Sequence, residues 1–454
     1  MKFLNNRMFS VIFGAFTIVL IVYSAHPQEL LAGFSIGEIT PEIGMEIPGG
    51  FNKNISTGIH DPLEINVIAI KFNETFYAFA SFDALVLPND LVGEIRKGVS
   101  ESFPIPSNHI ILSATHTHSG GPVADIFMSE RNEKYCTKLK SASLDAILTA
   151  LKNLKPISLA VNSSEVNGIA FNRRFYMKDG TVETHPGKMN PNIIAPAGPV
   201  DPQLLSLYFI GNEQLPYGAI VNYSLHTTVI GGNKFSADYI YYLRKFLRER
   251  WGQNLSVVFL NGACGDVTQV NNLSPESTEF GEGWAIKIGE TLALKVYEGF
   301  LWREPIEQPV IKSSSTVLDI NYRDFNSSPD SPHSGLGSDQ SKIFAREKEL
   351  LKKIISVSPT VKVELSAIRI GNIAIITNPT EMFCRLGLDI KKSSPARYTI
   401  LAELTNGYTG YCPTPEAFVE GGYEIQLARS SCMEENSALK ILKASRQLLS
   451  EIFR

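Results

Sequence analysis

Short hydrophobic runs recur along the chain and predict β-strands. They are rich in Ile, Val, Leu and Phe and cover residues 65–72, 76–85, 110–112, 219–225, 257–260 and 373–377. Segments with helical spacing of hydrophobic residues lie between them, for example 284–296 and 343–350. The alternation of the two patterns predicts an α/β or α+β fold, in which mixed β-sheets form layers flanked by helices.

The C-terminal segment predicts a final helix over residues 437–453. The hydrophobic residues that recur there at helical spacing are Leu439, Leu442, Leu449 and Phe453. This helix should therefore dock on the domain through one face. Two other segments predict long loops, because residues 177–202 are rich in Pro and Gly and residues 324–340 are rich in Ser and Pro. The first of these loops is a candidate lid.

The N-terminal segment has the pattern of a secretory signal. Lys2 and Arg7 precede a hydrophobic run over residues 8–23, and small residues follow it. We therefore expect residues 1–25 to be a signal peptide and the protein to be exported, to the periplasm or out of the cell. An uncleaved membrane anchor is the alternative. No later segment of the sequence is hydrophobic enough to span a membrane.

Composition narrows the function classes. Residues 26–454 contain no clear Gly-, Ser- or Pro-rich linker and predict one large domain. The formal net charge of -4 and the pI of about 6.1, without a basic cluster, argue against nucleic acid as a partner and against electrostatic membrane binding. The five cysteines have no metal-site spacing and are too few for a disulfide scaffold, and their odd number leaves at least one thiol free.

The strongest candidate for chemistry follows the predicted strand at 110–112. This segment reads Ser-Ala-Thr-His-Thr-His-Ser-Gly-Gly-Pro and carries His116 and His118 two positions apart. In an extended segment, residues i and i+2 face the same side, so both imidazoles can serve one metal site or acid–base site. Two histidines satisfied by hydrogen bonds in a polar loop are the alternative.

Three other segments place polar residues at the end of a predicted strand. His226 closes one hydrophobic run, Glu381 follows another after a Pro-containing turn, and the Gly-rich segment 261–268 follows a third. Backbone N–H groups or a hydroxyl of the Gly-rich segment could face a ligand. Taken singly, each has an ordinary structural explanation: a capped loop, a surface glutamate or a tight turn.

Together these motifs resemble the neutral, non-lysosomal ceramidases, a family of zinc-dependent amidases. The resemblance runs from about residue 32 to the last helix and is most specific at residues 115–121. Residues 33–41, 58–63 and 81–83 resemble the family's opening strand, its glycine-led turn and its aspartate-bearing strand. The resemblance implies one zinc ion per chain and hydrolysis of the amide bond of a lipid or small-molecule N-acyl substrate.

The resemblance also implies the zinc ligands. His116, His226 and Glu381 match three family ligands, and Tyr411 matches the family's tyrosine ligand, with Tyr408 as its rival. Two neutral imidazoles, a carboxylate and a phenol oxygen suit Zn²⁺, and the weak fourth ligand leaves room for a water molecule. Zinc lowers the pKa of such a water to about 7 and polarises the scissile carbonyl group.

Four further residues match positions that assist catalysis in the family. Arg173 resembles the arginine that holds the substrate, and Tyr423 follows Tyr411 at the spacing of the family's second active-site tyrosine. These two could bind the developing oxyanion or the substrate's polar head. His118 remains beside the metal and could carry a proton to the leaving nitrogen. Thr268 stands where the family has a serine, so the hydroxyl is kept while a methyl group narrows the pocket.

The sequence therefore predicts an exported zinc-dependent hydrolase of the ceramidase type, with ceramide or a related N-acyl compound as substrate. The proline that follows the family's serine is lost here, and the immunoglobulin-like C-terminal domain of the family is not expected in this chain. Two alternatives remain. One is a zinc hydrolase that cleaves another acyl bond, in an acylated sugar or amino acid, and the other is a secreted binding protein without turnover.

Overall fold

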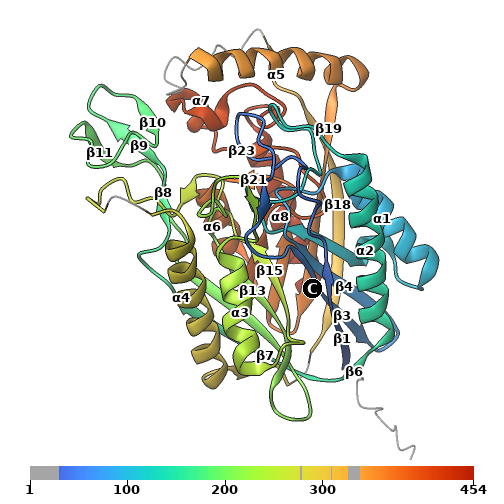
Figure 1. The fold of residues 1–454 in the computed structure, drawn as a ribbon. Coiled ribbons are helices and arrows are strands. Elements are labelled where there is room, and N and C mark those ends of the chain that lie inside the picture. The colour runs from blue at the N-terminus through green and yellow to red at the C-terminus, as the bar shows by residue number, and fades with distance from the viewer. Residues whose placement is uncertain (1–29, 277–278, 308, 326–337) are drawn as a thin grey trace, which may run out of the picture.

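The structure is a computed structural model that describes residues 30–276, 279–307, 309–325 and 338–454. Three large β-sheets surround a shared hydrophobic core, and helices cover their outer faces (Figure 1). The predicted signal peptide, residues 1–25, lies outside the described residues, as does most of the predicted loop at 324–340. No helix in the described part of the chain is long and hydrophobic enough to cross a membrane.

The first sheet is mixed and packs against two helices. In spatial order its strands are β5 (Ile110–Ala114), β4 (Thr75–Phe82), β3 (Glu64–Phe72), β1 (Leu30–Glu38) and β6 (Lys155–Pro156). Helix α2 (Glu133–Lys152) lies on β1 and β3, and α1 (Asn89–Ser102) packs on α2.

The second sheet is also mixed. Its strands in spatial order are β15 (Ser256–Asn261), β13 (Pro216–Tyr223), β12 (Gln203–Ile210), β7 (Ser158–Glu165) and β17 (Glu304–Pro305). Helices α3 (Tyr239–Trp251) and α4 (Glu282–Leu301) pack on each other and cover this sheet.

The third sheet has four strands: β18 (Ile311–Asn321), β19 (Thr360–Ile370), β20 (Ile373–Thr377) and β22 (Tyr398–Ala402). Helix α8 (Ser437–Phe453) packs on β18 and β19, and α6 (Cys384–Ser393) packs on β22 and α8. The predicted docking of the last helix is therefore confirmed, but Leu439 is not part of the packed face: it is 55% exposed, and Ala438 and Ile441 are buried instead. Helix α5 (Ser338–Val357) lies across one end of the molecule (Figure 1).

Smaller elements complete the chain. A three-stranded antiparallel sheet of β9 (Arg174–Met177), β10 (Val182–Thr184) and β11 (Ile193–Pro196) projects from the main body (Figure 1). The prediction of a plain loop at 177–202 was therefore wrong, because its Gly and Pro residues form the turns between short strands. The remaining elements are β2 (Gly58–Ile59), β14 (Lys234–Phe235), β8 (Phe171–Asn172), β16 (Val267–Thr268), β21 (Glu381–Met382), β23 (Tyr411–Cys412), α7 (Ala417–Glu420), and the 3₁₀ turns Ser107–His109 and Tyr423–Ile425.

Central strands are buried on both faces, which explains the unbroken hydrophobic runs in the sequence. In β3, Ile68 and Ile70 face the core shared by the three sheets, whereas Val67 and Ala69 face the helices. Strands β13, β15 and β20 alternate in the same way. The predicted layered α/β fold with mixed sheets is confirmed. All five cysteines are buried free thiols, as expected for a chain without a disulfide scaffold.

Each large sheet contains one parallel pair of neighbouring strands: β4 with β5, β13 with β15, and β20 with β22. Parallel neighbours end at the same edge of a sheet, so their loops leave together. The loops after β5, β13 and β20 carry His116, His226 and Glu381, one from each sheet. Side chains from three sheets therefore converge at one end of the shared core.

A buried ion pair lies between the first sheet and α3. Arg244 Nη1 lies 2.6 Å from Asp83 Oδ2, and both side chains are buried. The Asp83 carboxylate also accepts hydrogen bonds from the Glu64 N–H at 2.8 Å and the Thr115 hydroxyl at 3.3 Å. Burial raises the pKa of Asp83 to about 6, although Arg244 opposes that shift. Through the hydrogen bond from Thr115, the Asp83 carboxylate also holds the backbone directly before His116.

We expect Arg244→Met to lower the free energy of unfolding by about 3 to 5 kcal/mol, because it leaves the Asp83 carboxylate buried without its cation. Lys245→Met, on the exposed side of the same helix, is the matched control and should change stability by less than about 0.5 kcal/mol. Urea denaturation at neutral pH measures the difference. Equal stability of the two variants would show that the ion pair does not hold α3 to the first sheet.

Candidate metal centre

The loop after β5 holds its first histidine in an unusual backbone conformation. His116 has a φ of 66°, in the left-handed region that non-glycine residues rarely occupy. Its N–H donates to the Ala84 carbonyl oxygen at 2.9 Å, and its ring Nδ1 lies 2.8 Å from the Leu85 carbonyl oxygen. Such strain costs on the order of 1 to 3 kcal/mol and is typical of functional sites.

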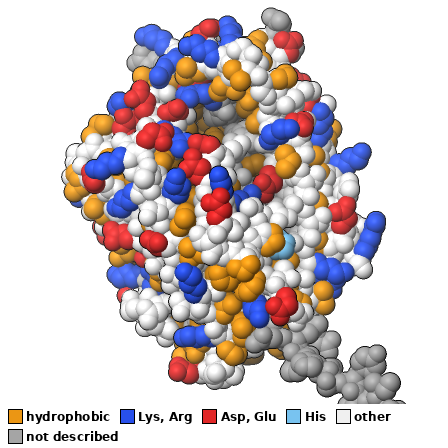
Figure 2. Space-filling model, turned by 90° about the vertical axis from the view of Figure 1, so that its right-hand side faces the viewer, with side chains coloured by type: hydrophobic (Ala, Val, Ile, Leu, Met, Phe, Trp, Pro, Cys, Tyr) orange, Lys and Arg blue, Asp and Glu red, His pale blue; other side chains and the backbone are white. Residues whose placement is uncertain are grey.

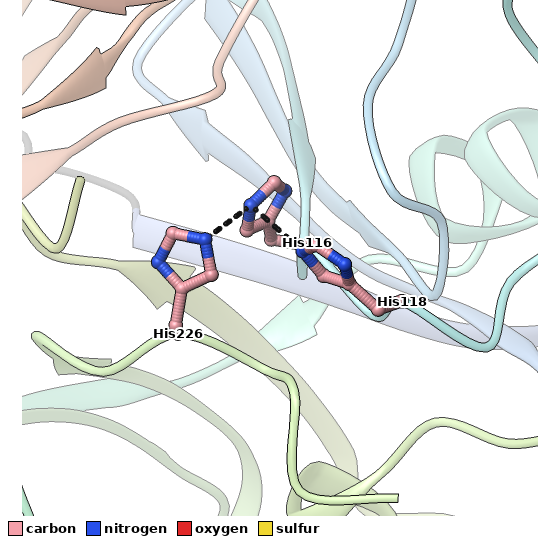
Figure 3. Close-up of side chains that lie close together, drawn as sticks. All are labelled: His116, His118 and His226. Carbon is pink, nitrogen blue, oxygen red and sulfur yellow. Dashed lines mark hydrogen bonds between the residues drawn. The ribbon is translucent and has the colours of Figure 1, made fainter. Parts of the chain in front are cut away.

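Three imidazole rings point toward one another (Figure 3). The Nδ1 atoms of His118 and His226 lie 2.9 Å from the carbonyl oxygens of Gly49 and Cys264. Together with His116, all three rings therefore have Nδ1 beside a backbone carbonyl oxygen. A carbonyl oxygen only accepts, so each Nδ1 carries the proton and each Nε2 offers a lone pair. Nε2 of His116 lies 3.0 Å from that of His226 and 3.4 Å from that of His118.

Lone pairs that face one another at these distances in a buried site repel unless a cation or a proton lies among them. The ligand atoms of His116, His118 and His226 lie within 4.8 Å of one another, so this group could bind a metal ion. The carbonyl contacts at Nδ1 fix the tautomer and the ring orientation, as the outer contacts of metal-binding histidines usually do.

Glu381 adds a negatively charged oxygen to the three rings. Its Oε2 lies 3.3 Å from Nε2 of His116 and 3.6 Å from that of His226. The Tyr408 hydroxyl donates to its Oε1 at 2.8 Å. Burial raises the pKa of Glu381, but His116 and the hydroxyls of Tyr411 and Tyr408 outweigh burial and lower it to about 2. The carboxylate is therefore charged at neutral pH.

The separations of these atoms fit a tetrahedral ion. Ligand atoms about 2.0 to 2.2 Å from a metal lie roughly 3.3 to 3.6 Å apart in tetrahedral geometry. The contacts of His116 with Glu381 and with His118 match this spacing, at 3.3 and 3.4 Å. Two overlapping ligand sets are therefore present: His116 and His226 together with either Glu381 or His118.

Short strand pairs bring the other predicted residues to the same place. In the β21–β23 pair, Glu381 lies directly opposite Tyr411. In the β16–β8 pair, Thr268 lies opposite Phe171. Just beyond this pair, the Arg173 N–H donates to the Asp266 carbonyl oxygen at 2.9 Å, so the segments that carry Thr268 and Arg173 lie side by side.

Arg173 organises the two predicted active-site tyrosines. Its Nη2 donates to the Tyr411 hydroxyl at 3.1 Å and to the Gly265 carbonyl oxygen at 2.6 Å. Its guanidinium lies 5.1 Å from the centre of the Tyr423 ring, and the two phenol oxygens lie 3.3 Å apart. Burial raises the pKa of Tyr423 to about 12, so its hydroxyl stays a hydrogen-bond donor at neutral pH.

All eight predicted site residues line a single cavity of about 290 Å³: His116, His118, Arg173, His226, Thr268, Glu381, Tyr411 and Tyr423. We call it the metal-side cavity. Tyr408, the rival of Tyr411, lines it as well, and both tyrosines reach Glu381. The structure thus brings together every residue that the sequence singled out, while the role of each one stays a prediction.

Sequence reasoning missed three groups at this site. His185, in the segment after β10, lines the metal-side cavity; burial lowers its pKa to about 4, so its ring is neutral. The carboxylate of Glu424 accepts from Arg173 Nε at 3.0 Å and contacts Arg174 Nη1 at 3.3 Å. Glu403 accepts from the N–H groups of Cys264 and Met382 at 3.2 and 2.9 Å. The only sequence signal for His185 was a lone histidine in a Pro- and Gly-rich segment.

Comparisons with known proteins identify the fold. No protein-family model matches the sequence, and no curated protein does. Among solved structures, neutral ceramidase from Pseudomonas aeruginosa superposes with a TM-score of 0.72 at 18% identity, over 94% of this chain and 75% of the other. A ceramidase complexed with C2 gives a TM-score of 0.72 at 17% identity, with the same coverage. The chain therefore has the neutral ceramidase fold, as the resemblance in its motifs predicted.

We expect the purified protein to hold about one divalent metal ion per chain and His226→Ala to lose it, because one of the convergent neutral nitrogen donors is removed. His109→Ala is the matched control, since His109 is a partly buried histidine whose Nδ1 lies 3.0 Å from the Phe76 carbonyl oxygen in the first sheet. Plasma mass spectrometry after dialysis measures the metal. Full metal content in His226→Ala would remove this residue from the ligand set.

Proposed function

We propose that this protein is a zinc-dependent amidohydrolase that cleaves the N-acyl amide bond of ceramide or of a related N-acyl compound. The observation that carries the proposal is the convergence of His116, His226 and Glu381 from three different sheets. Glu381 lies at tetrahedral spacing from both histidines, at 3.3 and 3.6 Å, and the two Nε2 atoms lie 3.0 Å apart. The two similar solved structures are described as ceramidases, which supports the same chemistry.

The proposed zinc ligands are His116, His226, Glu381 and Tyr411. Nitrogen and oxygen donors in this number suit Zn²⁺, and the anionic carboxylate offsets part of the ion's charge in a buried site. A zinc ion held there would lower the pKa of a coordinated water to about 7 and would polarise a carbonyl group. The protein's own part is to fix these donors, which the backbone carbonyls at Nδ1 do for the two histidines.

His118 is the proposed proton carrier. Burial, together with His116, lowers the pKa of His118 to about 3, so the ring is neutral at neutral pH and its Nε2 keeps a lone pair. Its Nδ1–H stays bound to the Gly49 carbonyl oxygen, which keeps Nε2 directed at the centre of the site. Nε2 would take a proton from the attacking water, whose oxygen bonds to the acyl carbon, and would pass that proton to the amide nitrogen as the C–N bond breaks, giving a carboxylate and an amine.

Arg173, Tyr411 and Tyr423 supply the positive and hydrogen-bonding side of the site. The buried guanidinium holds the Tyr411 hydroxyl and lies over the Tyr423 ring. Donors fixed in advance around a developing oxyanion stabilise it without reorganisation during the reaction. We therefore assign Arg173 and Tyr423 to binding of the oxyanion or of the substrate's polar head.

A second candidate is hydrolysis of a different acyl bond on a smaller substrate. The metal-side cavity has a volume of about 290 Å³, whereas ligand pockets commonly span about 300 to 1,000 Å³. This size favours a short acyl chain over the full length of a long-chain lipid. Acylated sugars and acylated amino acids are compact substrates of this kind.

Export remains part of the proposal. It rests on the basic and hydrophobic pattern of the first 25 residues of the sequence.

The direct test is hydrolysis of N-acylsphingosines with acyl chains of increasing length, followed by release of the fatty acid and the amine. Removal of the metal with a chelator should abolish activity, and added zinc should restore it. Cleavage of acyl esters without cleavage of any amide would replace the amidase proposal with the second candidate.

We expect His118→Ala to keep its metal and to lower kcat by roughly 10² to 10⁴-fold, the usual contribution of a general acid or base. Metal analysis and turnover are measured on the same sample. Loss of metal together with activity would instead make His118 a ligand and demote His116.

We expect Thr268→Val to lose most activity and Thr268→Ser to keep it. The buried Thr268 hydroxyl donates to Gln269 Oε1 at 3.1 Å, and its oxygen accepts from the Val270 N–H at 3.4 Å. Valine preserves the shape of the side chain but leaves the Val270 N–H without its acceptor, at a cost of about 1 to 3 kcal/mol. Gln269 Oε1 keeps the hydrogen bond from the Thr228 hydroxyl at 3.1 Å. Comparison of kcat/KM for the two variants measures the effect, and equal values would show that the loop is only a turn.

A further inference from the structure

A second cavity adjoins the metal-side cavity. We call it the outer cavity; its volume is about 460 Å³, and its charged lining residues are Asp90, Asp125, Arg131, Glu347 and Arg429. Ile126, Phe127, Tyr408 and Ser430 line both cavities and so form the wall between them. Figure 2 shows a hollow in the upper part of one face of the molecule, with acidic and basic side chains near it.

The cationic groups of the outer cavity are already matched by carboxylates. Arg429 Nε and Nη2 lie 2.8 and 2.7 Å from the two oxygens of Glu347. Arg131 Nη1 lies 2.6 Å from Asp90 Oδ2. Two guanidinium groups and three carboxylates therefore leave a slight negative excess, which disfavours phosphate and other anionic head groups.

The remaining groups suit an uncharged ligand with several hydroxyls. Asp125 Oδ1 accepts a hydrogen bond from the backbone N–H of Arg131 at 2.8 Å. A carboxylate can accept several hydrogen bonds, so Asp125 can also accept from a ligand. The paired guanidinium groups still offer N–H donors, so acceptors and donors lie around one space. Phe127 and Tyr408 add aromatic surface at the inner wall. Alternating donors and acceptors beside aromatic rings match the hydroxyls and the apolar C–H face of a sugar ring.

Tyr408 connects this space with the reaction site. Its ring lines both cavities, and its hydroxyl donates to Glu381 Oε1 at 2.8 Å. A group that occupies the outer cavity therefore lies one side chain away from the proposed metal ligand. The two cavities are therefore adjacent at Tyr408, and a substrate whose acyl carbonyl lies at the metal site would have its polar head on the side of the outer cavity.

We propose that the outer cavity is a subsite for an uncharged, hydroxylated head group, such as a sugar ring or a polyol, on the amine side of the N-acyl substrate. The inference rests on the proposed amide hydrolysis and narrows its substrate class. Asp125 is a specificity-determining residue in this proposal, because among the described residues its carboxylate forms no ion pair with a guanidinium and keeps acceptor capacity for a ligand.

The test compares two short-chain N-acylsphingosines that differ only in a glucosyl group on the head. Wild type should cleave the glucosylated amide, and Asp125→Ala should lower the ratio of kcat/KM values, glucosylated over plain, by about tenfold. Asp125→Asn, which keeps an acceptor oxygen, should lower the ratio less. Asp145→Ala, an exposed aspartate on α2, is the matched control and should leave the ratio unchanged. An unchanged ratio in Asp125→Ala, or a wild type that cleaves only the plain amide, would overturn the subsite.

A binding measurement separates this inference from the proposed function. Octyl glucoside below its micellar concentration carries a sugar and a hydrocarbon chain but no amide, so its affinity does not depend on hydrolysis. Calorimetry should give a Kd that rises severalfold from wild type to Asp125→Ala. If wild type cleaves neither amide yet shows this difference, the amidase proposal fails and the sugar subsite stands. Equal Kd values in the two proteins would overturn the subsite whatever the enzyme hydrolyses.

Discussion

The rest of the site depends on one electrostatic constraint: three imidazole Nε2 atoms face one another inside the protein. Each ring is oriented by a backbone carbonyl at Nδ1, so the rings cannot turn their lone pairs away without losing that bond. The arrangement costs free energy unless a positive charge lies between the rings. With one histidine held in a left-handed backbone conformation, this arrangement is one that could bind a metal ion.

The three-sheet architecture is what makes that convergence possible. His116, His226 and Glu381 come from loops after strands of three different sheets, so the site forms only when all three sheets have packed around the shared core. Glu403 reinforces this junction, because its carboxylate accepts N–H groups from the loop after β15 and from β21. Burial raises the pKa of Glu403 well above its usual range, so this buried side chain need not carry a charge beside Glu381. Fold stability and site geometry are therefore coupled.

The sequence predicted the parts of this site that lie at strand ends and little of what joins them. A polar residue directly after a hydrophobic run is visible in one dimension, which is why His116, His226 and Glu381 could be found. The β21–β23 pairing that places Tyr411 opposite Glu381 joins segments thirty residues apart through two residues each, and no periodicity marks so short a pair. The strands within 177–202 were missed for the same reason, because turn residues dominate their composition. The outer cavity has no sequence signature, since its charged residues come from separate loops and helices and look like ordinary surface positions.

In the proposed complex with substrate, the two cavities would recognise different parts of the molecule. Hydrophobic contact in the metal-side cavity discriminates weakly, because one methylene changes the free energy of binding by only about 1 to 3 kcal/mol. A buried polar group discriminates more strongly, since an unsuitable partner leaves it unpaired. In the outer cavity Glu347 is such a group, whereas Asp90 and Asp125 are exposed. Phe127 and Tyr408 form a wall whose inner side faces the reaction and whose outer side faces the polar groups. In that proposal, selectivity for the head group and positioning of the scissile bond would meet at the same two side chains, and the Tyr408 hydroxyl bonds to the carboxylate of Glu381.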